Sequence, residues 1–483
     1  MALRKVVTSG LVWTFTQQFG NQVIGFVISL ILARLLLPEE FGLIAMIAVF
    51  VAVGNGLMDS GLSLSIIRDT EAGDRDFSTV FIFNVLAGTL IYLIIFAGAP
   101  FIAQFYDQEI LTNIIRVYCL TFILSAATSV HIALFTRNMN FKVQTLTAIP
   151  AAVISGALGI LLAIKGYGVW SLVYSSLLNS ILNFVLIWKY SSWFPSRIFD
   201  KNLFYKHWSY GYKLGLANLL NRIFNNLYLV VIGKYFSPAL LGFYSRAEST
   251  KQLPLSNIER ALNKVSFPMF VGIKDEPERL KSVFRKLLKM VLYIVSPVLM
   301  ISAALADPLF RFLFTEKWLP AVPYFQILCL GGLLLPLHSY NLSLLNIYGR
   351  SDLFLKLEIV KKILILFSLL LIIPFGIYGL LWGQVVLSVL AFVINAYYTQ
   401  RFITYPLRSQ LLDVFPIYLI TFFSATIVWL GDQKLFSEFP DFIRLLTGGI
   451  VGFGGYFILS IFGRFEQLPQ LIDLLRDRLE KKI

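Results

Sequence analysis

Apolar runs of about 20 residues recur along the chain from end to end, and short polar stretches separate them. A run of this length is typical of a helix that crosses the hydrocarbon core of a bilayer. The pattern predicts about 14 such helices, which take up most of the chain. Their expected limits are 11–33, 41–61, 78–100, 114–135, 146–164, 169–188, 211–233, 239–263, 290–312, 321–346, 357–374, 377–399, 411–430 and 442–463. The fold class is therefore an all-α polytopic membrane protein.

Composition supports this interpretation. Of the 483 residues, 57% are hydrophobic and only 14% are charged, and the mean hydropathy is +0.75. Soluble domains carry about 25% charged residues, so this chain lacks the charge to cover a soluble surface of its size. That excludes a soluble enzyme, a disulfide scaffold and a disordered protein. A net charge of +14 would indicate a nucleic-acid partner in a soluble protein. Here we expect the surplus of Lys and Arg in cytoplasmic loops, and no nucleic acid.

The basic residues between the spans predict the orientation of the chain. With the N-terminus inside, most of them fall in segments on the cytoplasmic side, Lys361 and Lys362 among them, and few fall outside. The positive-inside rule describes this bias. We therefore expect a multi-pass protein of a bacterial plasma (inner) membrane with both termini in the cytoplasm. An amphipathic helix over 465–482 is expected to lie on the inner leaflet.

The eighth span is unusually polar, because it carries Arg246, Glu248, Lys251, Glu259 and Arg260. If it did not cross, the basic segment that follows it would fall outside, against the charge rule. The sequence therefore predicts a polar helix that crosses the membrane. Only a water-filled cavity would tolerate such a helix.

Part of the sequence repeats at an offset of 200 residues. Arg34-Leu-Leu-Leu-Pro38-Glu-Glu-Phe-Gly42 ends the first span, and Lys234-Tyr-Phe-Ser-Pro238-Ala-Leu-Leu-Gly242 ends the seventh. The match predicts two six-helix halves related by an axis along the membrane normal, with a substrate site between them. The expected division is 1–199 for spans one to six, 200–405 for spans seven to twelve, and 406–483 for the last two spans and the tail.

Polar side chains form stripes on three of the apolar spans. An arginine at the bilayer centre costs roughly 2.5–3.5 kcal/mol on insertion scales, so water or an anionic ligand is expected beside these stripes. Amide side chains could instead join helices, Arg222, Arg246 and Arg260 could pair with Glu248 or Glu259, and Lys251 could extend its charge towards the membrane surface. The candidate cavity residues are Gln17, Gln18, Asn21 and Gln22 in the first span, Asn218, Asn221, Arg222 and Asn225 in the seventh, and Arg246, Lys251, Asn257 and Arg260 in the eighth.

Four further polar residues are candidates for ion coupling: Asp59, Asn55, Glu248 and Glu259. No Walker A lysine motif, His-Glu-x-x-His or Cys-x-x-Cys occurs in the sequence. We therefore expect a transporter rather than an enzyme, with no catalytic residue, no metal site and no cofactor.

The histidines and cysteines have ordinary structural interpretations. His131 and His338 are expected to be hydrogen-bonded packing residues within apolar spans. His207 is expected in a loop. Cys119 and Cys329 both lie in apolar runs and are expected to pack as free thiols.

The segment Arg34-Leu-Leu-Leu-Pro38-Glu-Glu-Phe-Gly42 resembles a signature of bacterial polysaccharide transporters. These are the Wzx-like flippases of the multidrug/oligosaccharidyl-lipid/polysaccharide exporter superfamily. Asp59-Ser-Gly61-Leu62, the polar seventh span and Gly242-x-Tyr244 are similar to the same family. The resemblance extends over nearly the whole chain. The branch it suggests exports colanic acid, O-antigen or lipopolysaccharide, although the two extra C-terminal spans resemble the lipid II flippase branch.

The resemblance implies two six-helix lobes in a V shape, as in multidrug antiporters of the superfamily, plus two C-terminal helices. It also implies a cationic cavity, for which the matching residues are Arg222, Arg246, Lys251 and Arg260. The implied substrate is an undecaprenyl-diphosphate-linked oligosaccharide, moved to the outer leaflet by alternating access for export as exopolysaccharide, capsule or O-antigen. Membrane lipids, a proton or sodium ion, and polysaccharide polymerase and export proteins are the further partners implied.

The residues suit this substrate, because Arg pairs with phosphate oxygens and Asn and Gln offer a glycan both donors and acceptors. The alternatives are a cation-coupled multidrug antiporter, a lipid II flippase, a membrane polymerase or ligase, and a non-catalytic scaffold. A drug antiporter would favour acidic cavity residues. A polymerase would need a large outer loop with catalytic residues, which the predicted loops do not offer.

Overall fold

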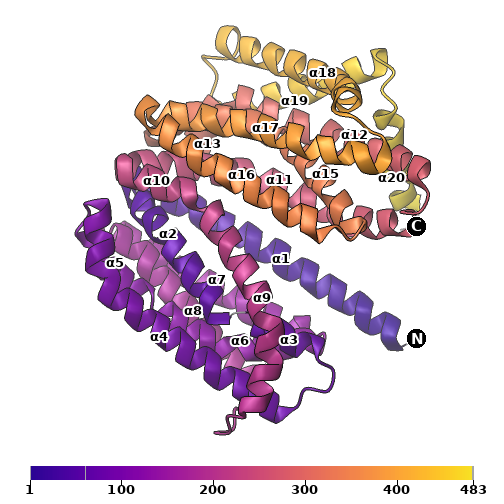
Figure 1. The fold of residues 1–483 in the computed structure, drawn as a ribbon. Coiled ribbons are helices and arrows are strands. Elements are labelled where there is room, and N and C mark those ends of the chain that lie inside the picture. The colour runs from indigo at the N-terminus through magenta and orange to yellow at the C-terminus, as the bar shows by residue number, and fades with distance from the viewer. Residues whose placement is uncertain (1, 60, 481–483) are drawn as a thin grey trace. The chain divides into compact units, whose positions relative to one another are not determined.

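The computed structural model describes residues 2–59 and 61–480, with the side chains of 13, 14, 16–58, 61–213, 215–256 and 266–473. Every regular element in these ranges is a helix (Figure 1). The contacts divide the chain into two compact units, one ending at Gly242 and the other beginning at Phe243. The expected all-α polytopic class is confirmed.

The first unit contains ten helices among its described residues, and the start of an eleventh. They are α1 (Ala2–Leu35), α2 (Pro38–Asp59), α3 (Leu62–Arg68), α4 (Asp74–Tyr106), α5 (Ile110–Tyr118), α6 (Thr121–Arg137), α7 (Phe141–Ile164), α8 (Val169–Tyr190), α9 (Lys201–Asn225), α10 (Leu227–Tyr235) and α11 (Pro238–Gly272). Helix α7 packs against α1 and α8, while α9 packs against α2, α3 and α4.

The second unit contains the rest of α11 and the C-terminal helices. They are α12 (Pro277–Ala304), α13 (Ala306–Phe314), η1 (Glu316–Ala321), α14 (Val322–Gly332), α15 (Leu335–Ile347), α16 (Ser351–Ile372), η2 (Ile373–Phe375), α17 (Gly376–Ile403), α18 (Leu407–Lys434), α19 (Asp441–Phe462) and α20 (Gln467–Glu480). Helices α18 and α19 pack against each other and against α12. Gly448 and Gly452 of α19 permit that approach, because a Cβ there would lie 2.6 Å from Leu305 and 2.9 Å from Val428.

Local sequence explains several helix starts. Asp200 caps α9, since its carboxylate accepts hydrogen bonds from the backbone N–H groups of Asn202 (2.8 Å) and Leu203 (3.3 Å). Pro38 and Pro238 are the first residues of α2 and α11, where proline loses no intrahelical hydrogen bond. The repeated Pro therefore starts a helix in both halves of the sequence repeat.

All fourteen predicted spans coincide with helices, although four of them are each divided into two helices, as in α5–α6 and α9–α10. Length and hydropathy alone identify 11 membrane-spanning segments among the described residues, and one of these, Ser351–Ile403, contains both α16 and α17. The remaining predicted spans, α9–α10 and α11, are too polar for that criterion. These two carry most of the candidate cavity residues.

The sequence prediction was wrong about the start of the eleventh span. The expected span begins at 357, whereas α16 already begins at Ser351, and the placement of Lys361 and Lys362 on the cytoplasmic side stays a prediction. Lys361 therefore lies about 15 Å along the helix at 1.5 Å per residue. It forms an ion pair with Glu358 one turn earlier.

Two glycines of the sequence repeat mark a close approach between α2 and the start of α11. A Cβ on Gly42 would lie 1.8 Å from the carbonyl oxygen of Pro238, and a Cβ on Gly242 would lie 1.9 Å from that of Pro38. The glycine near the start of each helix thus lies against the carbonyl of the proline that begins the other helix. The repeated Pro-x-x-x-Gly pattern is therefore a reciprocal backbone contact in the first unit.

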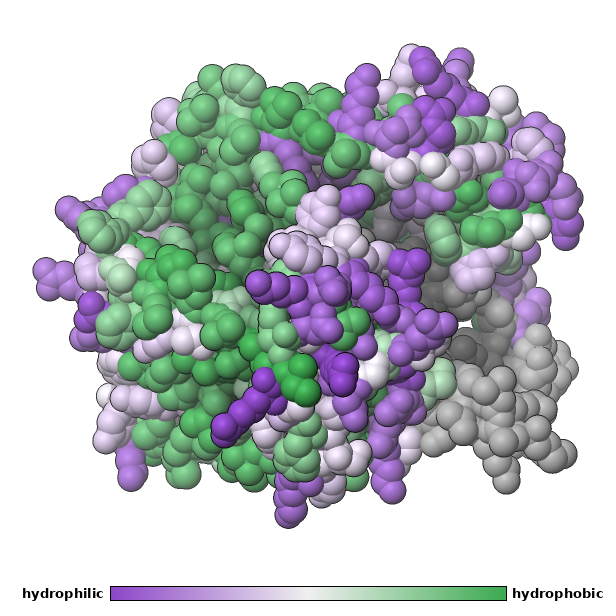
Figure 2. All heavy atoms as spheres, turned by 60° about the horizontal axis from the view of Figure 1, so that its bottom comes forward, coloured by the Kyte–Doolittle hydropathy of each residue, from purple (hydrophilic) through white to green (hydrophobic). Residues whose placement is uncertain are grey.

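Large apolar side chains cover much of the exterior. Figure 2 shows broad hydrophobic areas, with hydrophilic side chains gathered in patches. Phe462 is 81% exposed and Leu370 is 72% exposed, which would be unfavourable in water and suits contact with lipid tails. Cys119 and Cys329 are buried free thiols, as expected.

The two compact units are defined by contacts, whereas the predicted division into three parts is defined by the sequence repeat. The predicted division at 1–199, 200–405 and 406–483 follows the sequence repeat and stays a prediction. The contacts group α9 and α10 with the first unit, because α9 packs on α2, α3 and α4. The C-terminal helix α20 lies where an amphipathic helix was expected, and its position on the inner leaflet also stays a prediction.

Candidate functional site

Helix α9 of the first unit carries an exposed polar stripe. Asn218, Arg222 and Asn225 are all exposed, and Asn221 is exposed beside them. Leu216 and Leu220 are exposed too, but they lie on the opposite face, about 180° around the helix at 100° per residue. One face of α9 is thus suited to lipid, and the other to water or a polar ligand.

Arg222 is the cation of this stripe. Its side chain has no ion pair with a carboxylate among the described residues. Its stem lies over Gly56 of α2, where a Cβ would be 3.3 Å from Arg222 Cδ. Gly56 has no side chain and so leaves room for Arg222. No described carboxylate forms an ion pair with Arg222.

The span is interrupted directly after the stripe. Asn226 separates α9 from α10, and both its backbone N–H and its side-chain Nδ2 donate to the carbonyl of Arg222, Nδ2 at 2.7 Å. Interrupted membrane helices are tolerated where they line a cavity, and transporter sites are often built on them. The break therefore lies where the polar residues gather.

The polar residues of α1 are less open than those of α9. Gln18 is exposed, whereas Gln17, Asn21 and Gln22 are half-buried, as is Asn55 of α2. The Oδ1 atom of Asn21 is buried and accepts no hydrogen bond from the described residues.

Arg246 of α11, in the second unit, is buried against aromatic rings. It is 9% exposed, and its guanidinium carbon lies 5.0 Å from the ring centre of Phe314 and 5.1 Å from that of Trp318. These distances are those of cation–π contacts.

Lys251 lies one turn and a half further along α11 and pairs with Glu248 at 2.7 Å. The lysine side chain is 9% exposed and the glutamate 35%. The sequence interpretation had offered Glu248 as an ion-pair partner for Arg222, Arg246 or Arg260, whereas in the structure it pairs with Lys251.

Sequence reasoning missed a further ion pair of this unit, Glu358–Lys361 in α16. The i, i+3 spacing of opposite charges was visible. The helix start directly after Gly349-Arg350 was the overlooked signal. His338 and His131 are packing residues as expected, bonded to Ser388 and Ser191 at 2.9 Å each.

Four predicted site residues lie outside the described side chains: Asp59, Asn257, Glu259 and Arg260. Their roles stay predictions.

His207 corrects another expectation. It lies in α9 rather than in a loop, and it is fully buried. One ring nitrogen lies 2.8 Å from Ser65 Oγ of α3, and the other lies 2.9 Å from Asp76 Oδ1 of α4. Asp76 also accepts the Gly73 N–H at 3.0 Å. The histidine thus joins three helices of the first unit.

Asp69, Asp76 and His207 lie close enough together to resemble a metal site. Lys206 already supplies the positive charge there, at 2.5 Å from Asp69 and 3.9 Å from Asp76. Its hydrogen bond holds the pKa of the Asp69 carboxyl below its usual range. We therefore assign the cluster to structure.

Asp76→Ala is expected to destabilise the first unit by about 2 kcal/mol, because it removes a helix-start hydrogen bond and leaves a buried imidazole without its acceptor. Asp69→Ala is the matched control, since its partner Lys206 is half exposed and such pairs are worth about 0.2–1 kcal/mol. Thermal unfolding of both purified variants measures the difference. Equal melting temperatures for the two variants would contradict the assignment.

Comparison with known proteins gives consistent results. Residues 31–323, more than half of the chain, match the family described as polysaccharide biosynthesis protein. The teichuronic acid biosynthesis protein TuaB of Bacillus subtilis (strain 168) is 26% identical over 426 residues, covering 87% of this chain and 88% of its own. The lipopolysaccharide biosynthesis protein WzxC of Escherichia coli (strain K12) is 25% identical over 371 residues, covering 75% and 74%. The succinoglycan biosynthesis transport protein ExoT of Rhizobium meliloti (strain 1021) is 25% identical over 339 residues, covering 70% and 68%.

Among solved structures, the lipid II flippase MurJ in an inward closed conformation has a TM-score of 0.74 with this chain. The match covers 94% of this chain and 99% of MurJ at 16% identity, so the likeness is one of fold. The resemblance noted in the sequence is confirmed by these matches: the chain belongs to the polysaccharide biosynthesis protein family.

Proposed function

We propose that this protein is a flippase that moves an oligosaccharide linked to undecaprenyl diphosphate from the inner to the outer leaflet of the membrane. It works by alternating access and supplies polysaccharide export. The names of TuaB, WzxC and ExoT support a role in polysaccharide biosynthesis and transport. The MurJ-like fold is compatible with moving a lipid-linked substrate.

One observation carries the proposal: the exposed stripe of α9, with Arg222 and no described carboxylate partner. An arginine facing lipid would be costly, so the stripe requires water or an anionic ligand beside it. Helix packing by the amides accounts for it poorly, because Asn218 and Asn225 are exposed rather than buried between helices.

The chemistry of the stripe suits a glycan attached to a diphosphate. The guanidinium of Arg222 donates paired hydrogen bonds to phosphate oxygens. The amides of Asn218, Asn221 and Asn225 offer donors and acceptors for sugar hydroxyls. The polyprenyl chain can stay in the bilayer, so the cavity encloses only the headgroup.

The second unit contributes cations of a different kind. Arg246 is held by aromatic rings and Lys251 by Glu248, so both keep their positions without a ligand. We assign them to the electrostatic attraction of the diphosphate, with Gln17, Gln18, Asn21 and Gln22 as glycan contacts in the first unit. Asn257 and Arg260 belong to the same proposal. Asn55, Asp59, Glu248 and Glu259 are the candidates for binding a coupling proton or sodium ion.

The charge of the connections supports an orientation with both termini in the cytoplasm of a bacterial cell. The substrate would then enter from the leaflet where it is made. Polymerase and export proteins on the outer side would take up the product.

A cation-coupled drug antiporter is the second candidate. Its cavity should be acidic, whereas the described charged residues among the candidate cavity and coupling residues are Arg222, Arg246, and Lys251 with its partner Glu248. A lipid II flippase shares the fold and would share the cationic site. It is distinguished by the substrate alone.

Arg222→Ala is expected to lower the rate of flipping at least about tenfold, because a lost charged hydrogen-bond donor is worth about 1.5–3 kcal/mol. The assay uses purified protein in liposomes with a labelled undecaprenyl-diphosphate oligosaccharide. The fraction reachable by an external glycan-modifying enzyme is followed over time.

Leu220→Ala is the matched control, since it changes an exposed residue on the opposite face of the same helix and should flip at the wild-type rate. Arg222→Lys should keep part of the activity, because lysine keeps the charge and loses the paired donors. Wild-type flipping by Arg222→Ala would remove this residue from the mechanism. Cation-driven dye efflux without glycan flipping would favour the antiporter.

A further inference from the structure

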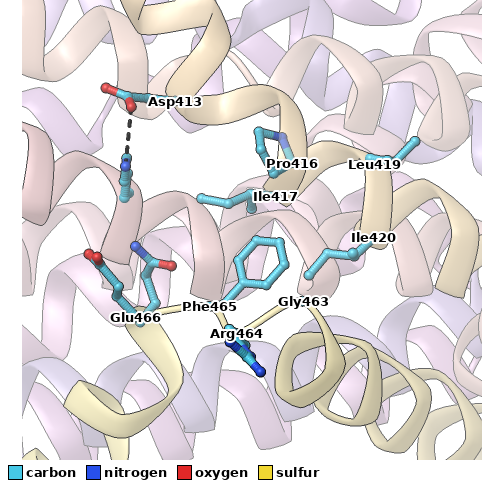
Figure 3. Close-up of a pocket in the computed structure, with 11 residues that line it drawn as sticks. Asp413, Pro416, Ile417, Leu419, Ile420, Gly463, Arg464, Phe465 and Glu466 are labelled. Carbon is cyan, nitrogen blue, oxygen red and sulfur yellow. Dashed lines mark ion pairs between the residues drawn. The ribbon is translucent and has the colours of Figure 1, made fainter.

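A pocket of about 480 Å³ lies in the second unit and is lined by none of the candidate site residues described above. Three segments line it: Lys289 of α12, the stretch Asp413–Ile420 of α18, and the turn Gly463–Gln467 between α19 and α20 (Figure 3). The volume is within the range of small-molecule sites, about 300–1,000 Å³.

The pocket is polar at one end and apolar along its wall. Asp413 is the seventh residue of α18 and Ile420 the fourteenth, so the pocket extends about 10 Å along the helix from its charged part. In Figure 3 the ring of Phe465 lies between Ile417 and Ile420, which form the apolar part. Lys289 directly precedes the buried apolar run of α12 that begins at Met290. This polarity gradient matches that of a lipid at a membrane interface.

The polar end carries a surplus of positive charge. Asp413 pairs with Lys289 at 3.1 Å, marked by the dashed line in Figure 3, and with Arg285 through two contacts of 2.7 Å. Tyr405 donates a further hydrogen bond to it at 2.6 Å. Two cations therefore surround one carboxylate, and Arg464 and Glu466 also line the pocket, so three cations accompany two carboxylates. A phosphate group would complete the charge balance.

Arg464 also has an unusual backbone. It ends α19 in the left-handed conformation, with φ at 51°. The N–H of Phe465 bonds to the carbonyl of Ser460 at 3.0 Å, which is the hydrogen bond of a Schellman helix end. Glycine is the residue that normally occupies this position, yet the glycine here is the preceding Gly463, which has an ordinary negative φ. Arg464 thus adopts an unfavourable backbone conformation at a position where it lines the pocket.

From this combination we propose that the pocket binds an anionic phospholipid of the surrounding membrane. The headgroup phosphate lies between Lys289 and Arg464, and an acyl chain follows Phe465, Ile417 and Ile420. Basic pockets between helices at the cytoplasmic side are typical sites for anionic headgroups. The neighbouring Phe462 and Leu419 are 81% and 58% exposed, so the pocket opens beside a surface suited to lipid.

The test uses the full-length protein in detergent, with bound lipid counted by native mass spectrometry. Phosphatidylglycerol and phosphatidylcholine with identical acyl chains are the probes. We expect phosphatidylglycerol to bind at least about tenfold more tightly, and Arg464→Gly to remove most of that preference while binding of phosphatidylcholine stays unchanged.

Arg464→Gly separates binding from folding, because glycine relieves the left-handed conformation and should leave the melting temperature unchanged or raised. Lys289→Met should also weaken binding, since Asp413 keeps Arg285 and Tyr405. Arg408→Ala is the matched control, because it removes an exposed cation of α18 that does not line the pocket.

Equal loss of the preference in Arg408→Ala and Arg464→Gly would overturn the proposal in favour of diffuse surface charge. Equal binding of the two phospholipids to the unaltered protein would overturn it as well. Displacement of phosphatidylglycerol by millimolar inorganic phosphate would assign the pocket to a soluble anion. Displacement by an equimolar polyprenyl diphosphate would assign it to the transported substrate. These results do not depend on whether the protein flips a glycan.

Discussion

Gly42→Ala and Gly242→Ala are each expected to prevent stable folding of the first unit. The added Cβ would lie 1.8 Å or 1.9 Å from a proline carbonyl oxygen, and Cβ atoms do not approach other atoms this closely. The obstacle is backbone at the first residue of a helix, so a change of rotamer cannot relieve it. Overpacking of a core typically costs about 1–3 kcal/mol, and we expect the upper end or more. Fluorescence-detected size-exclusion chromatography after heating measures the loss.

Gly25→Ala and Gly98→Ala are matched controls for this experiment. Both glycines lie within helices, and a Cβ on either would meet no atom within 4 Å. Alanine is the better helix former by about 1 kcal/mol, so these variants should be as stable as the unaltered protein or more so. If Gly42→Ala behaved like Gly98→Ala, the close approach of α2 and α11 would not exist in the folded protein.

Arg444→Met is expected to destabilise the second unit by about 3–5 kcal/mol, the usual cost of removing one partner of a buried ion pair. Arg444 of α19 bonds to both carboxylate oxygens of Asp432 of α18, at 2.8 Å and 2.7 Å. Asp432 is 1% exposed and would be left as an isolated buried charge. The melting temperature of the purified variant measures the effect.

Two further variants isolate the cause. Asp432→Asn should cost less than Arg444→Met, because Arg444 keeps Asp441 at 3.4 Å and Asp307 at 3.7 Å. The double variant Asp432→Leu with Arg444→Met should be more stable than Arg444→Met alone, since it leaves no uncompensated carboxylate at position 432. Additive losses in the double variant would show that the two residues act independently.

The fold could be predicted from the sequence because its main determinant is local. A run of about 20 apolar residues favours a spanning helix wherever it occurs, and each of the fourteen predicted spans coincides with one helix or with a pair of helices. The polar eighth span, α11, was predicted through the charge of the segment that follows it, which hydropathy alone does not use.

The contacts of individual polar residues could not be predicted in the same way. The hydrogen bonds of His207 join α9 to residues 131 and 142 positions away, and no periodicity encodes such a distance. The aromatic rings around Arg246 come from α13 and η1, far along the chain. Glu358–Lys361 was missed although both residues lie in the expected span 357–374 and are three residues apart, the spacing of neighbours on one helix face.

The candidate site was predicted as a set of residue types on helix faces. The exposure of Asn218, Arg222 and Asn225 agrees with a polar face. The sequence pattern could not distinguish a cation with no described carboxylate partner from a cation that pairs with a neighbouring carboxylate. Arg222 and Lys251 both appear in the sequence simply as bases among polar residues. Only the described contacts distinguish Lys251, paired with Glu248, from Arg222.

The burial of both native thiols has a practical consequence for topology. Cys119 is 1% exposed and Cys329 is 0% exposed, so thiol reagents cannot reach either sulfur in the folded protein. A cysteine introduced into any connection would then be the single reactive thiol, with no need to remove the native ones. Labelling with a membrane-impermeant maleimide from one side of sealed vesicles can therefore report which connections face the cytoplasm.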